Sequence, residues 1–293
     1  MKTRSIIFDT DIGTDVDDAL ALAVILGEPG IDLRAVTTVY GDTLLRARLT
    51  ARYARLAGRE VVAHIGERDT LSGRPIWWAG HEGTLHDDLE AEPVGRRSGV
   101  DVLIDEVIAH PGEIDVVAVG PLTNIATAIE REPAFAAAVG HLWIMGGSFT
   151  TDEPEHNFRS DITAAQRVFD AAIPTTVASL DVTRLVQMRA EQLQRIASAG
   201  PLGAALERDI HQWWAFWNET WNVPHDPIVV LAMTRPELFS LSEPGRIEII
   251  STGELEGVSR FVPDADGTVR YLSDLRAEDV AEAIVDGVVA AQA

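Results

Sequence analysis

The chain has 293 residues, 46% hydrophobic and 24% charged, a composition typical of a globular α/β protein with a substantial core, and we expect one domain over residues 1–293. A formal net charge of −22 disfavours nucleic acid or an anionic membrane as a partner, and the lack of cysteine excludes disulfides, thiolate catalysis and cysteine-ligated zinc. Neither a signal-peptide core nor an apolar stretch of membrane-spanning length is found, so a cytoplasmic protein is expected.

The first predicted elements enclose a cluster of acids. Residues 5–8 predict a short buried strand and residues 19–26 a helix. No Lys or Arg lies between Arg4 and Arg34, so we interpret the cluster as a site for a hard divalent cation. Helix capping explains at most two of the acids. The acids are Asp9, Asp11, Asp15, Asp17 and Asp18.

Strands and helices alternate along the next two thirds of the chain. The expected strands are 33–40, 61–65, 114–119, 142–145 and 175–180, and the expected helices are 44–57, 100–110, 122–130 and 161–172. This alternation predicts an α/β fold, with a mostly parallel open sheet and flanking crossover helices. From residue 189 we expect helix until residues 246–250, for which we expect an antiparallel pairing with residues 258–262.

Polar clusters follow several of these strands, where ligands bind in such folds. Each has an ordinary structural interpretation when taken alone: Asn124 as a helix cap, Gly146-Gly147 as a turn, and His225-Asp226 as a capping pair. The clusters are residues 37–42, 120–124, 145–147, 155–157 and 223–227.

The order of these clusters resembles the calcium-dependent nucleoside hydrolases, the inosine-uridine preferring family. The family's Asp-x-Asp-x-Gly and Asp-Asp-Ala elements match Asp9 to Gly13 and Asp17 to Ala19. Its Thr-Thr-Val-x-Gly-Asn, Gly-Leu-Thr-Asn, Met-Gly-Gly, Glu-x-Asn and His-Asp-Pro elements are similar to residues 37–42, 121–124, 145–147, 155–157 and 225–227. The resemblance spans residues 5–227 and implies a Rossmann-like nucleoside hydrolase fold.

The resemblance also implies roles for these residues. One Ca²⁺ is expected on Asp11, Asp18, Asp226 and the backbone carbonyl of Thr123, with Asp11 as the general base for a calcium-activated water. His225 is the candidate acid for the leaving base, and His81 a weaker candidate for contacting that base. The remaining candidates for substrate contact, which include the ribose ligands, are Asp17, Asp42, Met145, Glu155, Asn157 and Asp226.

The chain departs from the family pattern in three places. The acidic turn is two residues longer than its shortest version, so Asp15 can take the role given to Asp17 or join the metal ligands. Asp42 stands where the pattern has Asn, and His156 stands where an apolar aromatic is familiar. These exchanges leave the base preference open.

Tryptophans are candidates for stacking on the base, although core packing is the more ordinary interpretation. Trp77 and Trp78 lie in a loop at residues 73–88 that is rich in Gly, Trp and His. Trp213, Trp217 and Trp221 are four residues apart, and we expect them to share one face of a helix.

The predicted activity is hydrolysis of a ribonucleoside to free base and ribose by a homodimer or homotetramer. One alternative is a haloacid-dehalogenase-type Mg²⁺-dependent phosphatase with Asp9 as the nucleophile, although such enzymes generally need a later lysine and this chain has none after Lys2. A calcium-binding EF-hand is a second alternative. It fails because its sixth and twelfth positions are Thr14 and Leu20 instead of Gly and Glu.

Overall fold

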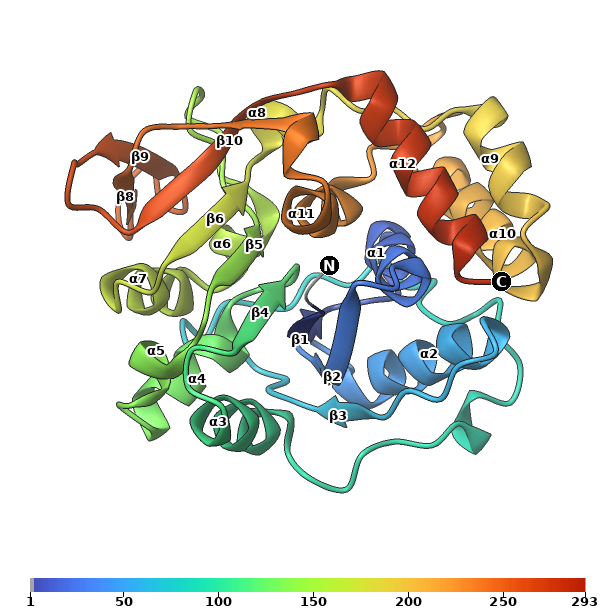
Figure 1. Ribbon diagram of the computed structural model, residues 1–293, viewed down its shortest axis with the longest axis horizontal. Coiled ribbons are helices and arrows are strands. Elements are labelled where there is room, and N and C mark those ends of the chain that lie inside the picture. Colours follow the sequence, from blue (N-terminus) through green and yellow to red (C-terminus); the bar gives the residue numbers. More distant parts are fainter. Residues whose placement is uncertain (1–2, 293) are drawn as a thin grey trace.

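The computed structural model describes residues 3–292 and is built around one ten-stranded sheet (Figure 1). The strand order is β3-β2-β1-β4-β5-β6-β10-β8-β9, with β7 paired to β10. The strands are β1 (Arg4–Thr10), β2 (Ile31–Thr38), β3 (Ala63–Ile65), β4 (Ile114–Ala118), β5 (Leu142–Met145), β6 (Thr175–Ala178), β7 (Phe239–Leu241), β8 (Gly245–Ile249), β9 (Ser259–Pro263) and β10 (Val269–Leu275). The first six follow the 3-2-1-4-5-6 order of Rossmann folds, which confirms the predicted fold class.

Pairing changes direction once along the sheet. Every pair from β3 to β6 is parallel, and so is the pair of β6 with β10. The remaining pairs are antiparallel, including β8 with β9, where Ile247 lies opposite Phe261. The expected antiparallel pairing of residues 246–250 with 258–262 is therefore confirmed.

Helices cover both faces of the sheet (Figure 1). One face carries α1 (Asp17–Gly27), α2 (Thr43–Leu56), α9 (Ala190–Ala197), α10 (Gly200–Trp217), α11 (His225–Thr234) and α12 (Ala277–Ala290). The other carries α3 (Gly99–Ala109), α4 (Thr123–Arg131), α5 (Phe135–Ala138) and α7 (Ile162–Asp170). Short helices are α6 (His156–Ser160), α8 (Leu180–Thr183), and the 3₁₀ turns Leu89–Ala91 and Pro236–Leu238.

The central strand β1 is buried on both faces, which explains its continuous apolar run. Ile6 and Phe8 pack into the core beneath α1 and α11, whereas Ile7 packs into the core beneath α3 and α4. Successive side chains of a strand point to opposite faces, so a strand between two helical layers needs apolar residues at every position.

The C-terminal third departs from the sequence prediction. Strand β7 lies in a region expected to be helical, and β10 inserts between β6 and β8. The buried positions of β10 include Val269, Leu272 and Leu275, which are three apart, so the alternation typical of a strand is missing. Helix α12, after β10, also lay outside the predicted elements.

Helix α10 ends earlier than the tryptophan spacing suggested. Its last residue is Trp217, and Asn218 follows in the left-handed conformation with φ 55°. The expectation that Trp221 shares a helix face with Trp213 and Trp217 is therefore wrong. A left-handed Asn ends the helix before that turn can form.

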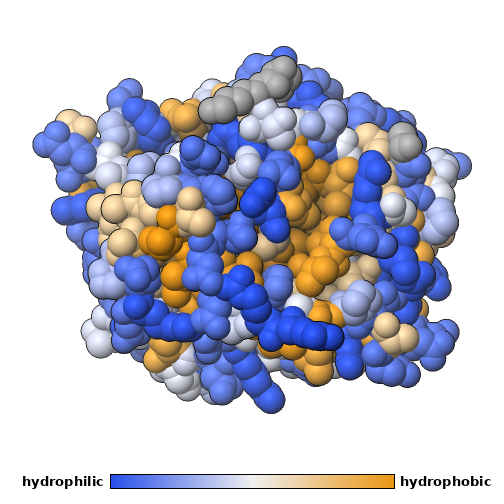
Figure 2. All heavy atoms as spheres, turned by 60° about the horizontal axis from the view of Figure 1, so that its bottom comes forward, coloured by the Kyte–Doolittle hydropathy of each residue, from blue (hydrophilic) through white to orange (hydrophobic). Residues whose placement is uncertain are grey.

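One face of the molecule carries both polar and apolar residues at its surface. Hydrophilic residues cover most of the face in Figure 2, and its hydrophobic residues are divided into patches. Among the helices of residues 3–292, none has the length and apolar character needed to cross a bilayer.

Candidate active site

The site lies where the order of the sheet reverses, between β1 and β4. Asp9 is the penultimate residue of β1, Asp11 directly follows the strand, and Thr123 begins α4 shortly after β4. Gly120 keeps the two ends close, because a Cβ there would come within 2.7 Å of Asp11 Oδ1 and 2.9 Å of Val39. Ligands of open α/β sheets bind at this kind of reversal.

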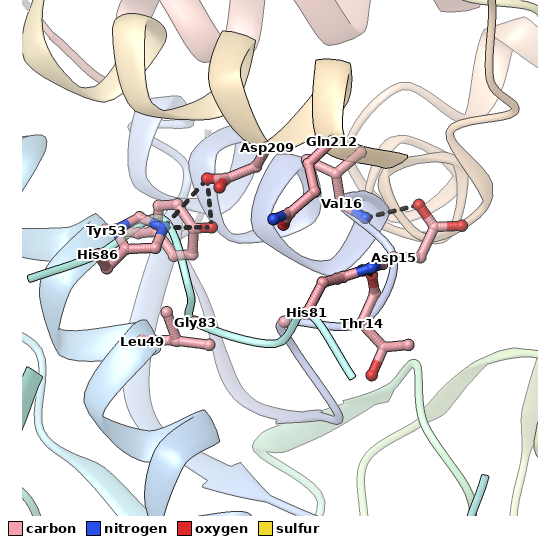
Figure 3. Close-up of a pocket in the computed structure, with 11 residues that line it drawn as sticks. Thr14, Asp15, Val16, Leu49, Tyr53, His81, Gly83, His86, Asp209 and Gln212 are labelled. Carbon is pink, nitrogen blue, oxygen red and sulfur yellow. Dashed lines mark hydrogen bonds and ion pairs between the residues drawn. The ribbon is translucent and has the colours of Figure 1, made fainter. Parts of the chain in front are cut away.

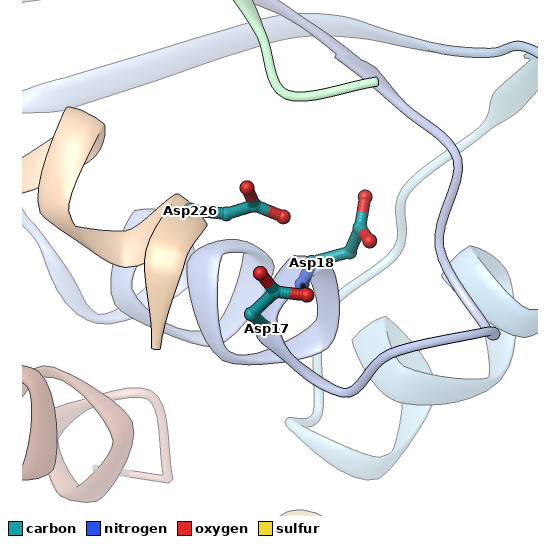
Figure 4. Close-up of side chains that lie close together, drawn as sticks. All are labelled: Asp17, Asp18 and Asp226. Carbon is teal, nitrogen blue, oxygen red and sulfur yellow. Dashed lines mark hydrogen bonds between the residues drawn. The ribbon is translucent and has the colours of Figure 1, made fainter. Parts of the chain in front are cut away.

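Three buried carboxylates meet beside it, from two helices far apart in sequence. Asp17 and Asp18 begin α1, and Asp226 is the second residue of α11. Figure 4 shows the three side chains turned toward one another, and one carboxylate oxygen of each lies within 4.8 Å of the others. The structure thus brings two N-terminal acids together with the distant Asp226. All three offer carboxylate oxygens, which are the ligands that hard divalent cations prefer.

Electrostatics favours a cation in this cluster. Burial raises the pKa of Asp17, Asp18 and Asp226 well above the ordinary value, and their mutual repulsion and that of Asp11 add to the effect. Two helix N-termini help to offset the negative charge. Carboxylates held this close can all be ionised together only with added positive charge, so these residues fit a metal ion.

Asp11 and Asp15 lie around this trio. Asp11 is buried, and its Oδ2 is 3.9 Å from the guanidinium of Arg46. Asp15 accepts a hydrogen bond from the backbone N–H of Val16, and burial, followed by repulsion from Asp18 and Asp11, raises its pKa to about 8. Arg46 is a counter-charge that sequence proximity could not reveal, because it reaches the acidic turn from α2.

Asp9 lies below the site and is fully buried. Its Oδ1 accepts hydrogen bonds from Thr37 Oγ1 and from Asn124 Nδ2, the latter at 2.6 Å, while its buried Oδ2 has no hydrogen-bond partner among residues 3–292. Burial raises its pKa to about 7. Asn124 also accepts from the backbone N–H of Glu67, so it joins two strand ends to a loop instead of capping a helix. A carboxyl enclosed in this way is poorly placed to act as a phosphatase nucleophile.

Thr123 is held by a residue that the sequence analysis did not single out. Its Oγ1 donates to Asp161 Oδ2 at 2.8 Å. Asp161 is fully buried and also accepts from the backbone N–H groups of Leu71 and Ser72. In the sequence, the only sign of this role was an Asp at the first position of the helix expected at 161–172. Asp161 therefore connects the Thr123 side chain to the loop that contains Leu71 and Ser72.

Two of the candidate ribose ligands, Glu155 and Asn157, are buried, and Asn157 lies at the carboxyl ends of β4 and β5. Glu155 caps α6 and accepts from the backbone N–H groups of Gly147, Asn157 and Phe158. Asn157 Nδ2 donates to the carbonyl of Val119 at 2.8 Å and to that of Met145 at 3.3 Å. Both bonds involve the amide nitrogen of Asn157, and they fix the orientation of its side chain.

Asp42 and Met145 occupy different environments. Asp42 is exposed and caps α2 by accepting from the backbone N–H of Leu45 at 3.0 Å. Met145 is buried at the end of β5, with its sulfur 3.5 Å from Asn157 Nδ2. Met145 therefore lies beside a candidate ribose ligand, whereas the observed bond of Asp42 is a helix cap.

His225 begins α11 directly before Asp226. Its Nδ1 is 2.7 Å from Thr183 Oγ1, which fixes the ring. Burial, followed by the charge of Arg184, lowers its pKa to about 4, so the imidazole is neutral at pH 7 in the ion-free protein. Its location fits the expected acid, while its pKa works against full protonation at neutral pH.

Aromatic side chains from a loop and a helix meet close by. The Trp77 ring lies 5.7 Å from His156 and 6.4 Å from Phe216, and His81 lies 5.2 Å from Phe216. Phe216 stacks on Trp213 at 5.7 Å. Trp77 and Phe216 remain 40% and 43% exposed, so they can still cover a ligand. Sequence analysis had not included Phe216.

A small cavity beside Asp15 is closed by a polar cluster (Figure 3). Tyr53 donates to Asp209 at 2.7 Å, and His86 Nε2 lies 3.2 Å from the same carboxylate. His81 Nε2 lies 2.9 Å from the carbonyl of Thr14. These contacts fasten α2, α10 and the loop to one another beside the acidic turn.

Sequence comparisons relate the chain to nucleoside hydrolases. A family model described as inosine-uridine preferring nucleoside hydrolase matches residues 6–282. A probable uridine nucleosidase 2 of Arabidopsis thaliana is 30% identical over 87% of this chain and 85% of its own. A pyrimidine-specific ribonucleoside hydrolase of Citrobacter koseri is 28% identical over 81% of each chain.

Solved structures show the same fold. A plant nucleoside hydrolase superposes with a TM-score of 0.88 at 27% identity, covering 98% of this chain and 99% of its own. A purine-preferring ribonucleoside hydrolase from Gardnerella vaginalis gives 0.87 at 22% identity, covering 99% of both chains. These matches give the phosphatase alternative no support.

Proposed function

The chain belongs to the inosine-uridine preferring nucleoside hydrolase family, and is a hydrolase acting on N-glycosyl compounds; from this premise we propose that it is a calcium-dependent hydrolase of pyrimidine ribonucleosides. The observation that carries the proposal is the meeting of Asp17, Asp18 and Asp226, with Asp11 close enough to repel Asp18 and Asp226. Relatives named uridine nucleosidase make uridine the first substrate to test.

We propose that Asp11, Asp18, Asp226 and the carbonyl of Thr123 hold one Ca²⁺. When bound, this ion lowers the pKa of a coordinated water and neutralises the crowded carboxylates. The raised pKa values of Asp18 and Asp226 support the assignment, because a buried acid cluster without a cation is electrostatically unfavourable. Asp15 is retained as a candidate ligand, since its carboxylate lies within Coulombic reach of Asp11 and Asp18.

Asp11 is the proposed general base. It removes a proton from the attacking water as the bond from the ribose carbon to the base nitrogen breaks. The sugar carbon then develops positive charge that the ground state lacks, so the surrounding carboxylates stabilise the transition state more than the substrate. The acids thus serve both the nucleophile and the sugar.

Asp17, Glu155, Asn157 and Asp226 are the proposed ribose ligands, with Met145 and Asp42 at the edge of the site. The bonds that fix Asn157 support its part, because they hold the amide while using only Nδ2. Glu155 accepts three backbone N–H groups, so besides its proposed contact with ribose it holds Asn157 and Gly147 in position.

His225 is the proposed donor to the leaving base. If Thr183 donates to Nδ1, the proton of the neutral ring is on Nε2, the nitrogen left to hydrogen-bond a departing base. We propose that Trp77, Phe216 and His81 cover the base, which exposed aromatic rings beside the site support.

The resemblance also leads us to propose a homodimer or homotetramer, one domain over residues 1–293, and a cytoplasmic location. The continuous sheet from β3 to β9 supports the single domain. Light scattering of the purified protein during size-exclusion chromatography measures the assembly directly.

The function is tested with a panel of purine and pyrimidine ribosides, assayed for released reducing sugar, with nitrophenyl phosphate included. We expect ribose release from uridine and no phosphate release. Phosphate release without ribose release would instead support the phosphatase alternative.

A further inference from the structure

Arg46 is a fully buried cation beneath the acidic turn. It lies in the first turns of α2, and its side chain is 1% exposed. Its Nε donates to the carbonyl of Tyr40 at 2.7 Å, one terminal nitrogen donates to the carbonyl of Ile12 at 2.9 Å, and the other donates to Thr14 Oγ1 at 3.3 Å. All three guanidinium nitrogens are therefore bonded to oxygens around the turn.

We propose that Arg46 is a positioning residue for the metal site, which holds the long acidic turn in the geometry that Asp11 needs. This inference rests on the proposed function, because it assigns Asp11 to the ion. Ile12 directly follows Asp11, and Thr14 belongs to the segment that makes this turn longer than the family's shortest version. Because Arg46 bonds to Ile12 and Thr14, on both sides of Gly13, it keeps the two extra residues of the turn from displacing Asp11.

The bond lengths favour positioning over charge compensation alone. The closest approach of Arg46 to Asp11 is 3.9 Å, which is an ion pair without a hydrogen bond. Its three hydrogen bonds go instead to two backbone carbonyls and a hydroxyl. A planar fork with fixed directions can make these bonds at once, whereas the ammonium of Lys cannot.

The same guanidinium connects the turn to the aromatic loop. Trp78 packs over it, with the guanidinium carbon 5.1 Å from the ring centroid. Tyr40 has an uncommon φ of 67°, and its hydroxyl accepts from the backbone N–H of Trp77. Thr14 donates from Oγ1 to Glu82, which in turn accepts from the backbone of Ala79 and Gly80. The turn and the loop are therefore held as one unit through Arg46 and Thr14.

Arg55 provides a matched control. It lies nine residues further along α2, which is the opposite face of the helix, and pairs with Glu92. Its side chain is 59% exposed, and Arg52 also pairs with Glu92, so Glu92 keeps a partner in Arg55→Met. Arg55→Met thus removes one guanidinium from α2 without reaching the site.

The test is calorimetric titration of CaCl₂ into chelator-stripped wild type, Arg46→Lys, Arg46→Met and Arg55→Met, with unfolding temperatures measured in chelator. Outer-shell residues of metal sites typically contribute about 10- to 100-fold to affinity. We expect Arg46→Lys and Arg46→Met to bind calcium at least about tenfold more weakly than wild type, and Arg55→Met to bind like wild type. If Arg46→Met does not fold, Arg46→Lys and Thr14→Val, which removes one acceptor of the fork, make the same comparison.

Wild-type affinity in Arg46→Lys, with tighter or unchanged binding in Arg46→Met, would overturn the inference. Tighter binding would show that Arg46 acts on the ion only through its charge, and unchanged binding that it does not act on the ion at all. An equal loss of affinity in Arg55→Met would overturn it too, since the effect would then be general to α2. A wild type that binds no calcium would overturn the proposed function, and the inference with it. That outcome differs from the failure of the inference alone, in which wild type binds calcium and the Arg46 variants bind it equally well.

Discussion

Asp17 and Asp226 place carboxylate oxygens within 4.8 Å of each other, although one begins α1 and the other begins α11. The two helices pack side by side on one face of the sheet (Figure 1). Both acids lie in the first turns of their helices. Both helices also contribute buried apolar residues, such as Leu20 and Val230, to one core cluster, and this packing sustains the approach of like charges. The site is therefore assembled by helix packing and needs a cation to be neutralised.

Asp11→Asn tests the general base with minimal change of shape. We expect kcat for uridine to fall by about 10²- to 10⁴-fold, which is the usual contribution of a positioned base. Steady-state assays of released ribose measure it, with Asp69→Asn as a control because that side chain is 87% exposed. An Asp11→Asn enzyme as active as Asp69→Asn would rule out this role.

The pH dependence of stability tests the acid cluster. Folded-state pKa values are raised for Asp9 to about 7, for Asp15 to about 8 and for Asp226 well above normal, against about 3.9 in the unfolded chain. Groups with raised pKa values contribute stability that is fully present below the unfolded pKa and is lost as pH rises through the folded pKa. In chelator, the free energy of unfolding should therefore fall from pH 5 to pH 8.

Urea unfolding at several pH values, in chelator and in calcium, measures this slope. Calcium should stabilise the protein most at pH 8, because it binds the ionised carboxylates. A calcium-induced stabilisation that is larger at pH 5 than at pH 8 would contradict the assignment.

His225→Ala tests assistance to the leaving base. We expect uridine hydrolysis to slow far more than hydrolysis of nitrophenyl riboside, whose leaving group needs no proton. Thr183→Val removes the hydrogen bond to Nδ1 and should reproduce part of this difference. Equal slowing of both substrates would indicate that His225 only positions its neighbours.

Trp77→Ala tests the aromatic cover. Base–aromatic stacking contributes about 1–3 kcal/mol, so KM for uridine should rise at least about fivefold with a smaller change in kcat. Trp143→Phe is the control, since Trp143 lies toward the amino end of β5 beside Arg4. An unchanged KM in Trp77→Ala would place the base elsewhere.

The sheet of the N-terminal two thirds could be predicted because its strands are continuous apolar runs between helical stretches. Strand β10 could not, since its buried residues are three apart and polar residues fill the positions between them. The end of α10 depended on one left-handed Asn218, which no pattern of tryptophans reveals.

The site itself was only partly visible in the sequence. The acidic turn predicted a metal site by its own composition, whereas Asp226 was joined to it only through the family resemblance. Arg46 and Asp161 were missed, because both act through contacts between distant segments. Buried polar residues that hold a site in place have no local sequence pattern, so the structure was needed to identify them.

The most direct test is ribose release by metal-stripped protein as calcium is added back, for wild type and Asp226→Asn. The account predicts that stripped wild type is inactive, that activity rises with calcium to a single saturation, and that Asp226→Asn stays inactive at calcium concentrations that saturate wild type. Full activity in thorough chelation, or wild-type calcium dependence in Asp226→Asn, would contradict the claim that these acids form one calcium-dependent hydrolytic site.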